Sequence, residues 1–175
     1  MKRWTHWLGV KSPDANTYVP SAPAREGDLC IQYLGTAGFV ISQDGHHVVL
    51  DPYVTRPDLS TSLTQPLVPN APLIKRLIPH ANDVLIGHAH HDHILDGPDL
   101  CKQTGARLIG SSSTMQVGIA AGLPPEQLVS TDGREDIASG AWTVRGFPSR
   151  HGKIFGRIPF PGDLTAPPPW PARMH

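Results

Sequence analysis

The sequence has few cysteines and no excess of charge of either sign. Its 175 residues include 2 cysteines, and 15 lysines and arginines balance 15 aspartates and glutamates. Two cysteines cannot form the disulfide framework of a small secreted domain, so we expect Cys30 and Cys101 to be small, buried or half-buried hydrophobic residues. A balanced charge provides no net field toward nucleic acid or an anionic membrane. We therefore expect neither nucleic acid nor a membrane among the partners.

Long apolar runs are also absent. No stretch approaches the roughly 20 apolar residues that span a membrane. The segment Met1–Val10 begins with basic residues but lacks the apolar core of a signal peptide, which predicts a cytoplasmic protein. The 19 prolines and 17 glycines indicate many turns and argue against a helical bundle.

The length is that of one ordinary domain, and the sequence pattern divides it unequally. Residues 1–27 show neither a helical nor a strand period, so we expect an extended N-terminal arm, with Trp4 and Trp7 as candidate anchors. Residues 28–175 carry the periodic segments and are predicted to form the folded domain.

The periodic segments predict an α/β fold that opens with an antiparallel meander. Strands are expected at 29–34, 39–42 and 48–51, with a hairpin turn at Asp44-Gly45. The later elements are expected to be helices at 72–78, 98–104 and 112–121 and strands at 84–87, 107–110, 128–129 and 142–147. Residues 52–71 are rich in Pro, Ser and Thr and predict a long ordered loop, a candidate wall of a substrate pocket. Arg56 in this loop is expected to be a solvated charge, with anion binding as the alternative.

The strongest chemical signal is the run His88-Ala89-His90-His91-Asp92-His93, directly after the apolar stretch 84–87. Neutral imidazole and carboxylate are preferred ligands of zinc and other borderline divalent ions. The run follows a predicted buried strand, at the end where α/β sheets usually bind ligands. A solvated His-rich loop is the alternative, but such a loop would need neither the interleaved Asp92 nor the strand before it.

The pattern His-x-His-x-Asp-His resembles that of the metallo-β-lactamase-fold metallohydrolases. The opening Tyr33–Phe39 and the later Leu50-Asp51-Pro52 look like the first strands of the same superfamily, in particular of a branch that includes lactonases. The resemblance implies an αββα sandwich, of which this chain would be the N-terminal part.

The resemblance also implies roles for individual residues. The residues that match its metal ligands are His88, His90, Asp92, His93 and His151. Of these, His88, His90 and His151 match ligands of a first ion, whereas Asp92 and His93 match ligands of a second. Asp92 is also our candidate catalytic residue, because its carboxylate could orient or deprotonate a water. Asp51 matches an outer-shell residue, with a simple turn-forming role before Pro52 as the alternative.

The remaining histidines do not match ligands. His91 occupies the variable position of the motif, and His46 and His47 are expected to be strand or turn residues.

The C-terminal third departs from the family pattern. Relatives normally continue through a second half that supplies a bridging aspartate and a last histidine. Asp163 only superficially resembles the bridging residue, and His175, as the final residue, is a poor candidate for precise ligation. We expect an incomplete second metal site and a fragment of a longer protein; pairing with another copy and an untranslated remainder are the alternatives. A sandwich without its second half would expose an apolar sheet face.

Taken with the resemblance, these residues predict a metal-dependent hydrolase that uses a metal-bound hydroxide on a small ester, lactone or phosphodiester. One or two Zn²⁺ ions are expected, with Mn²⁺ or Fe²⁺ as alternatives. The expected partner is a small-molecule substrate, and self-association is allowed. A non-catalytic member with a structural or binding role is the alternative function.

Overall fold

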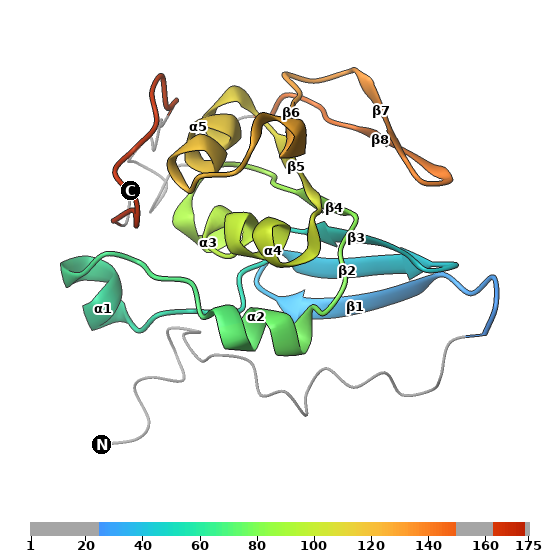
Figure 1. Cartoon of the computed structure of the whole chain (residues 1–175), viewed down its shortest axis with the longest axis horizontal. Helices are drawn as coiled ribbons and strands as arrows, with labels where there is room; N and C mark the ends of the chain where they lie inside the picture. Colours follow the sequence, from blue (N-terminus) through green and yellow to red (C-terminus); the bar gives the residue numbers. More distant parts are fainter. Residues whose placement is uncertain (1–24, 150–162, 174–175) are drawn as a thin grey trace.

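The computed structural model describes residues 25–149 and 163–173. His151 and His175, and nearly all of the predicted arm, therefore lie outside the described residues. The fold is α/β: a six-stranded sheet with the order β1-β2-β3-β4-β5-β6, helices against it, and a separate two-stranded sheet β7-β8 (Figure 1). The strands are β1 Cys30–Gly35, β2 Gly38–Gln43, β3 His46–Leu50, β4 Asp83–Leu85, β5 Arg107–Gly110, β6 Leu128–Ser130, β7 Asp136–Ser139 and β8 Trp142–Arg145. The helices are α1 Leu59–Thr64, α2 Ala71–Leu77, α3 His91–Ile94, α4 Gly97–Thr104 and α5 Ser112–Ala120, with a 3-10 turn at Pro125–Gln127.

The chain opens with the predicted antiparallel meander. Strands β1, β2 and β3 pair antiparallel in sequence, with Ile31 opposite Ile41 and Phe39 opposite Leu50. The turn between β2 and β3 places Asp44 and Gly45 at φ values of 49° and 79°, the left-handed region that a tight hairpin of this kind requires. The Asp-Gly signal therefore set the register of this half of the sheet.

The second half of the sheet is parallel. Strands β3, β4, β5 and β6 are parallel neighbours, and a helical crossover joins each to the next. Right-handed crossovers that advance in one direction place all their helices on one face. Accordingly, α4 packs on β4 and β5, α5 packs on β5 and β6, and α2 packs against α4. The core between sheet and helices includes the buried side chains of Val49, Val84, Leu108, Ile74, Leu100 and Val117.

The three predicted helices are present, and capping residues mark their ends. The Asn70 side chain accepts a hydrogen bond from Leu73 N at the start of α2, and Ser111 caps α5 in the same way. Helix α4 ends at Gly105, whose φ of 77° is the left-handed conformation that favours glycine.

Four elements were missed by the sequence prediction, one of them the short 3-10 turn at Pro125–Gln127. The stretch 52–71, expected to be irregular, contains α1, which begins because Asp58 accepts hydrogen bonds from both Thr61 N and Thr61 Oγ1. The last strand is shorter than predicted and pairs with β7, which was not predicted because its residues Asp136–Ser139 give almost no apolar signal. The single turn α3 lies within the histidine cluster itself.

A buried polar cluster joins the hairpin β7-β8 to the large sheet. Ser139 Oγ donates to Asp83 Oδ2 at 2.5 Å, and Arg107 Nε donates to Asp83 Oδ1 at 2.6 Å. His46 Nε2 lies 3.0 Å from Ser139 Oγ. Three strands thus hold β7 through the carboxylate of Asp83, at the end of β4 opposite to the histidine cluster.

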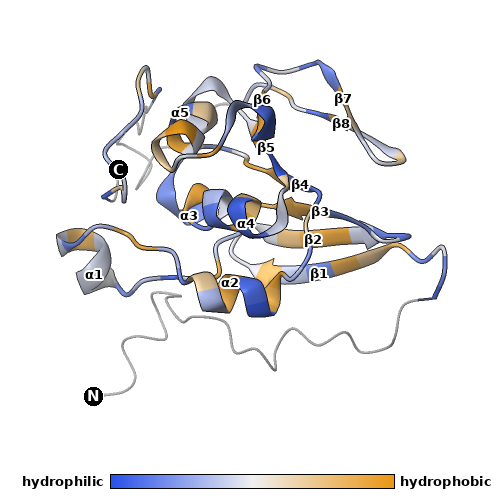
Figure 2. Ribbon diagram, viewed as in Figure 1, coloured by the Kyte–Doolittle hydropathy of each residue, from blue (hydrophilic) through white to orange (hydrophobic). Residues whose placement is uncertain are grey.

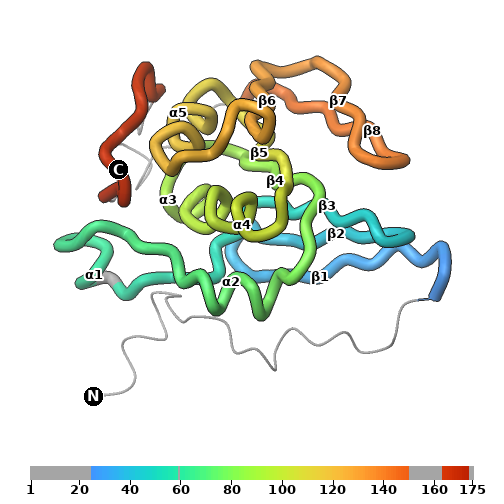
Figure 3. The backbone as a smooth tube through the Cα atoms, viewed as in Figure 1, coloured from blue at the N-terminus to red at the C-terminus, as the bar shows by residue number. Residues whose placement is uncertain are grey.

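Strands β1 and β2 are rich in apolar residues (Figure 2), and some of these side chains are exposed. Ile31 is 62% exposed and Tyr33 is 55% exposed, and each pairs across to a half-buried apolar residue of β2, Ile41 or Phe39. The segment 163–173 runs between α5 and the region of α1 (Figure 3). Leu164 N donates to Ser113 Oγ at 2.9 Å, and Leu67 N donates to Ala172 O at 2.7 Å. Within the described residues, no helix combines the length and the apolar composition needed to cross a membrane.

Candidate metal centre

The histidine cluster lies at the carboxyl end of β4. The chain leaves this strand through Ile86 and Gly87, turns at His88, and enters α3 with His90 at the N-cap. A single helical turn then places Asp92 and His93 over the end of the parallel strands. This edge of an α/β sheet is the usual place for a ligand.

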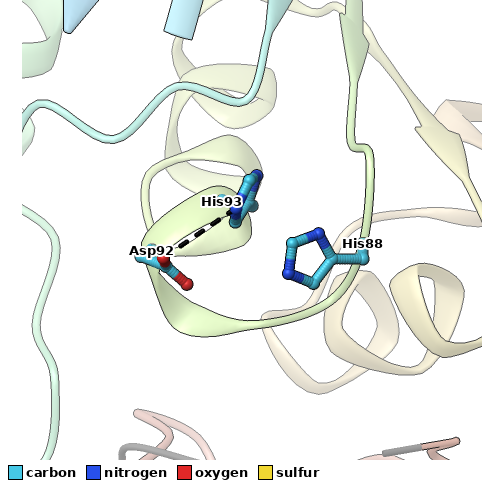
Figure 4. A group of neighbouring side chains, drawn as sticks. All are labelled: His88, Asp92 and His93. Carbon is cyan, nitrogen blue, oxygen red and sulfur yellow. Dashed lines mark ion pairs between the residues drawn. The ribbon is translucent and has the colours of Figure 1, made fainter. Parts of the chain in front are cut away.

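Within the part of the chain that the structure describes, His88, Asp92 and His93 form a group of side chains placed so that they could hold a metal ion (Figure 4). One ligand atom from each lies within 4.8 Å of the others. The rings of His88 and His93 are 3.9 Å apart between centroids, and His93 Nε2 lies 3.8 Å from Asp92 Oδ2. Two imidazoles and a carboxylate at such spacing are close enough to share one divalent ion.

The other predicted ligands are not members of this group of described residues. His90 lies beside His88, with ring centroids 4.5 Å apart, but is not one of the three. The sequence predicts that His88, His90 and His151 bind one ion and that Asp92 and His93 bind a second. This assignment stays a prediction, because His151 is outside the described residues. Asp163 is exposed and lies outside this group as well.

Asp51 contacts the cluster directly. Its Oδ1 accepts a hydrogen bond from Gly87 N at 2.7 Å, and its Oδ2 accepts one from His93 Nδ1 at 2.9 Å. A histidine that donates from Nδ1 in its neutral form keeps the lone pair of Nε2 free to bind a metal. The outer-shell role expected of Asp51 therefore agrees with the structure, and a turn-forming role alone does not account for these contacts.

The protonation of His93 reflects these neighbours. Burial lowers the pKa of His93, but the hydrogen bond to Asp51 and the negative charges of Asp51 and Asp92 outweigh burial and raise the pKa above its usual value. In the metal-free protein, a proton therefore competes with an ion for Nε2 over a wider pH range than at an isolated histidine.

Tyr53 packs beside the cluster. Its ring meets that of His91 edge-on, with centroids 6.1 Å apart and an interplanar angle of 85°. Tyr53 also forms a small buried hydrophobic cluster with Leu67 and Leu95. Burial raises the pKa of Tyr53 to about 12, with further contributions from the charges of Asp92 and Asp96, so the phenol is neutral at physiological pH. His91 thus packs against Tyr53, in keeping with its exclusion from the predicted ligands.

Asp96, which sequence reasoning missed, is a buried carboxylate three residues beyond His93. It accepts hydrogen bonds from Val54 N at 2.6 Å, Thr55 N at 2.7 Å and Thr55 Oγ1 at 2.5 Å. Burial raises the pKa of Asp96 to about 6, although these donors act in the opposite direction. The available signal was a charged residue directly after the apolar pair Ile94-Leu95, where burial requires hydrogen-bond partners.

Arg56 is not the solvated loop charge that was expected. Its half-buried guanidinium donates to Leu34 O at 2.7 Å and to Tyr53 O at 3.0 Å. A Cβ on Gly35 would lie 1.9 Å from Arg56 Nη2, so this glycine provides the space for the guanidinium. Arg56 therefore stabilises the loop after β3.

The family model described as "Beta-lactamase superfamily domain" matches residues 30–163, most of the chain. The chain belongs to the beta-lactamase superfamily. The match includes the first strands, the histidine cluster and the segment up to Asp163, so it covers every element that builds the site.

Individual relatives agree with this assignment. The chain is 31% identical over 97 residues to a UPF0173 metal-dependent hydrolase of Pyrobaculum arsenaticum. The matched region covers 55% of this chain and 39% of the relative. It is also 31% identical over 105 residues to a protein of the same description from Anaeromyxobacter sp. (strain K), covering 59% of this chain and 35% of that protein. The chain therefore spans less than half the length of these curated relatives.

A solved structure shares the fold. The chain is similar to Igni18, described as a novel metallo hydrolase from the archaeon Ignicoccus hospitalis, with a TM-score of 0.53 and 21% sequence identity. The similarity covers 75% of this chain and 53% of that structure. It supports the α/β architecture predicted from the sequence.

Proposed function

We propose that this protein is a metal-dependent hydrolase of small esters, lactones or phosphodiesters. The observation that carries the proposal is the grouping of His88, Asp92 and His93 at the carboxyl end of β4, with His93 oriented by Asp51. The relatives described as metal-dependent hydrolases support the same class of activity.

The residues present fit a divalent metal ion. Imidazole nitrogen and carboxylate oxygen are ligands of zinc and of other borderline ions, and a ligating histidine commonly donates its second N–H to a carboxylate, as His93 does to Asp51. A bound ion would supply Lewis acidity and lower the pKa of a water. We propose Zn²⁺, with Mn²⁺ or Fe²⁺ as alternatives, and we propose His90 and His151 as further ligands.

Asp92 is the residue proposed to handle the proton. Its side chain is 42% exposed, whereas that of Asp51 is 14% exposed and already accepts two hydrogen bonds. A carboxylate that is accessible and close to the ligand atoms can orient an attacking water and accept its proton. Esters, lactones and phosphodiesters share the requirement for such an attack at an acyl or phosphoryl centre.

Hydrolysis of a panel of esters, lactones and phosphodiesters tests the proposal. We expect at least one class to be hydrolysed, with loss of activity in chelator, recovery on addition of Zn²⁺, Mn²⁺ or Fe²⁺, and a fall of at least about 100-fold in Asp92→Asn. Metal bound without any such hydrolysis would contradict the proposal and favour a non-catalytic role. Asp28→Asn is the matched control, because Asp28 is an exposed aspartate just before β1, outside the group and without any match to a ligand of the family.

A further inference from the structure

The loop after β3 carries the residue that orients His93, and its backbone is unusual. Asp51 and Arg56, near its two ends, have φ values of 40° and 41°. Residues other than glycine adopt such values only where the surrounding structure holds them. The position of Asp51 against His93 therefore depends on what fixes this loop.

Three sets of hydrogen bonds fix the loop 51–56. Asp51 is held by its side-chain bonds to Gly87 and His93 and by its backbone N–H, which donates to Leu85 O at 2.9 Å; Arg56 is held through its bonds to Leu34 and Tyr53. The third set is formed by Asp96, whose buried carboxylate binds the two central amides and the Thr55 hydroxyl. Thr55 Oγ1 in turn accepts a hydrogen bond from Asn70 N at 2.7 Å, which connects the loop to the start of α2.

Asp96 comes from the same stretch of chain as the metal ligands. It follows His93 by three residues, after α3, and immediately precedes α4. The loop and the cluster are therefore joined at two points, Asp51 to His93 and Val54 with Thr55 to Asp96. If the second connection is removed, the loop retains fewer contacts to oppose relaxation of the Asp51 backbone.

We propose that Asp96 is a positioning residue of the metal centre: it fixes the loop 51–56 and so holds the Asp51 carboxylate against His93. Asp96 acts through Val54 and Thr55, and none of its hydrogen bonds goes to a member of the ligand group. This inference rests on the proposed metal-binding function of the His88 group.

A second buried aspartate provides the matched control. Asp83 is as buried as Asp96, accepts hydrogen bonds from Arg107 and Ser139, and likewise joins two parts of the fold. It lies at the start of β4, whereas the cluster follows the end of that strand. Loss of Asp83 removes a buried carboxylate whose hydrogen bonds go to Arg107 and Ser139 and not to the loop 51–56.

The test compares Asp96→Asn, Thr55→Val and Asp83→Asn in the full chain. In Asp96→Asn the single carbonyl oxygen can still accept from the Val54 and Thr55 amides, but the negative charge is lost and an N–H group replaces the oxygen that accepts from Thr55 Oγ1. Valine removes only the Thr55 hydroxyl. Zn²⁺ affinity is measured by competition with a chelator at a temperature where all variants are folded, and the visible absorption of bound Co²⁺ reports on ligand geometry.

We expect Asp96→Asn to weaken Zn²⁺ binding by about 10- to 100-fold and to alter the Co²⁺ spectrum, as removal of outer-shell partners usually does. Thr55→Val should act in the same direction with a smaller effect, and it carries the test if Asp96→Asn does not fold. Asp83→Asn should lower the unfolding midpoint and leave both metal readouts unchanged.

Unchanged Zn²⁺ affinity and Co²⁺ spectrum in the folded variants of Asp96 and Thr55 would overturn the inference, as would an equal loss of affinity in Asp83→Asn. His88→Ala is measured alongside. If His88→Ala does not weaken Zn²⁺ binding, the proposed function itself fails; if it does and Asp96→Asn does not, only the role of Asp96 fails.

Discussion

Asp51 Oδ2 lies 2.9 Å from His93 Nδ1, a contact between residues 42 positions apart in the sequence. It connects the antiparallel half of the sheet, through the loop after β3, to the helical turn that follows β4. The same carboxylate binds Gly87 N at 2.7 Å, so it also fixes the backbone directly before His88. This arrangement orients a ligand and leads to several measurable consequences.

Replacement of Asp51 should weaken metal binding without unfolding the protein. In Asp51→Asn the side chain can accept at its single carbonyl oxygen, so it cannot serve both Gly87 and His93 as the carboxylate does. We expect Zn²⁺ affinity to fall by about 10- to 100-fold in chelator competition. The exposed Asp28→Asn should retain the affinity of the parent protein. Equal affinities in Asp51→Asn and the parent would show that Asp51 does not orient His93.

The pH dependence of metal binding should differ between the parent protein and Asp51→Asn. Because the pKa of His93 is raised, metal-free His93 keeps its proton to a higher pH than an isolated histidine. Zn²⁺ affinity should therefore rise with pH through this raised pKa and level off above it. Asp51→Asn removes the hydrogen bond and charge that raise the pKa, so the rise should move to lower pH. Affinity measured from about pH 5.5 to 8 checks this, and superimposable profiles would contradict it.

Asp96 should make the metal-free protein less stable as the pH rises. Its pKa is raised to about 6 in the folded state, so the folded state binds more protons than the unfolded state above the ordinary aspartate value of about 3.9. The contribution of Asp96 to the free energy of unfolding is fully present below about pH 3.9 and is lost as the pH rises through about 6. A difference of about two pH units between the folded and unfolded pKa values corresponds to at most roughly 3 kcal/mol. Urea unfolding of Asp96→Asn should show a weaker decline in stability between about pH 4 and 7. If the free energy of unfolding of the parent and of Asp96→Asn changed with pH in parallel, Asp96 would not be the group that lowers stability as the pH rises.

Gly87 tests the position of Asp51 from the opposite side. A Cβ on Gly87 would lie 3.0 Å from Asp51 Oδ2, closer than atoms normally pack, so Gly87→Ala should displace the carboxylate. We expect a several-fold loss of Zn²⁺ affinity and a loss of stability of about 1 kcal/mol. Gly146→Ala is the control, because its Cβ would approach its nearest neighbour, Thr131 Oγ1, at an ordinary 3.5 Å. A tightly binding Gly87→Ala protein would show that the site tolerates movement of Asp51.

The parts of the fold that could be predicted are those with local signals. The strand at 107–110 and the helix that follows Ser111 agree with the structure because apolar runs and capping residues mark them directly. Helix α1 was missed because its Ser and Thr residues favour irregular structure, and only the Asp58 cap shows where it begins.

In the site, too, residues with a local sequence signal could be predicted and those without one could not. His88, Asp92 and His93 are recognisable as candidate ligands from their types and spacing. Asp51 stood out as a charged residue at the end of an apolar strand, and the family resemblance implied its contact with the site. The role of Asp96 depends on a hydrogen-bonded loop about forty residues earlier, which local sequence patterns do not reveal. The same holds for Arg56, whose partners are backbone carbonyls.

His88, Asp92 and His93 are proposed to bind a metal ion, and metal analysis of the purified protein tests this binding most directly. Metal content and Zn²⁺ affinity are measured for the parent, for His88→Ala and for His93→Ala. We predict about one or more equivalents of Zn²⁺, Mn²⁺ or Fe²⁺ in the parent, and affinity at least about 100-fold weaker in each variant, because each loses a direct ligand. A parent protein with less than about half an equivalent, unchanged by either substitution, would contradict the account.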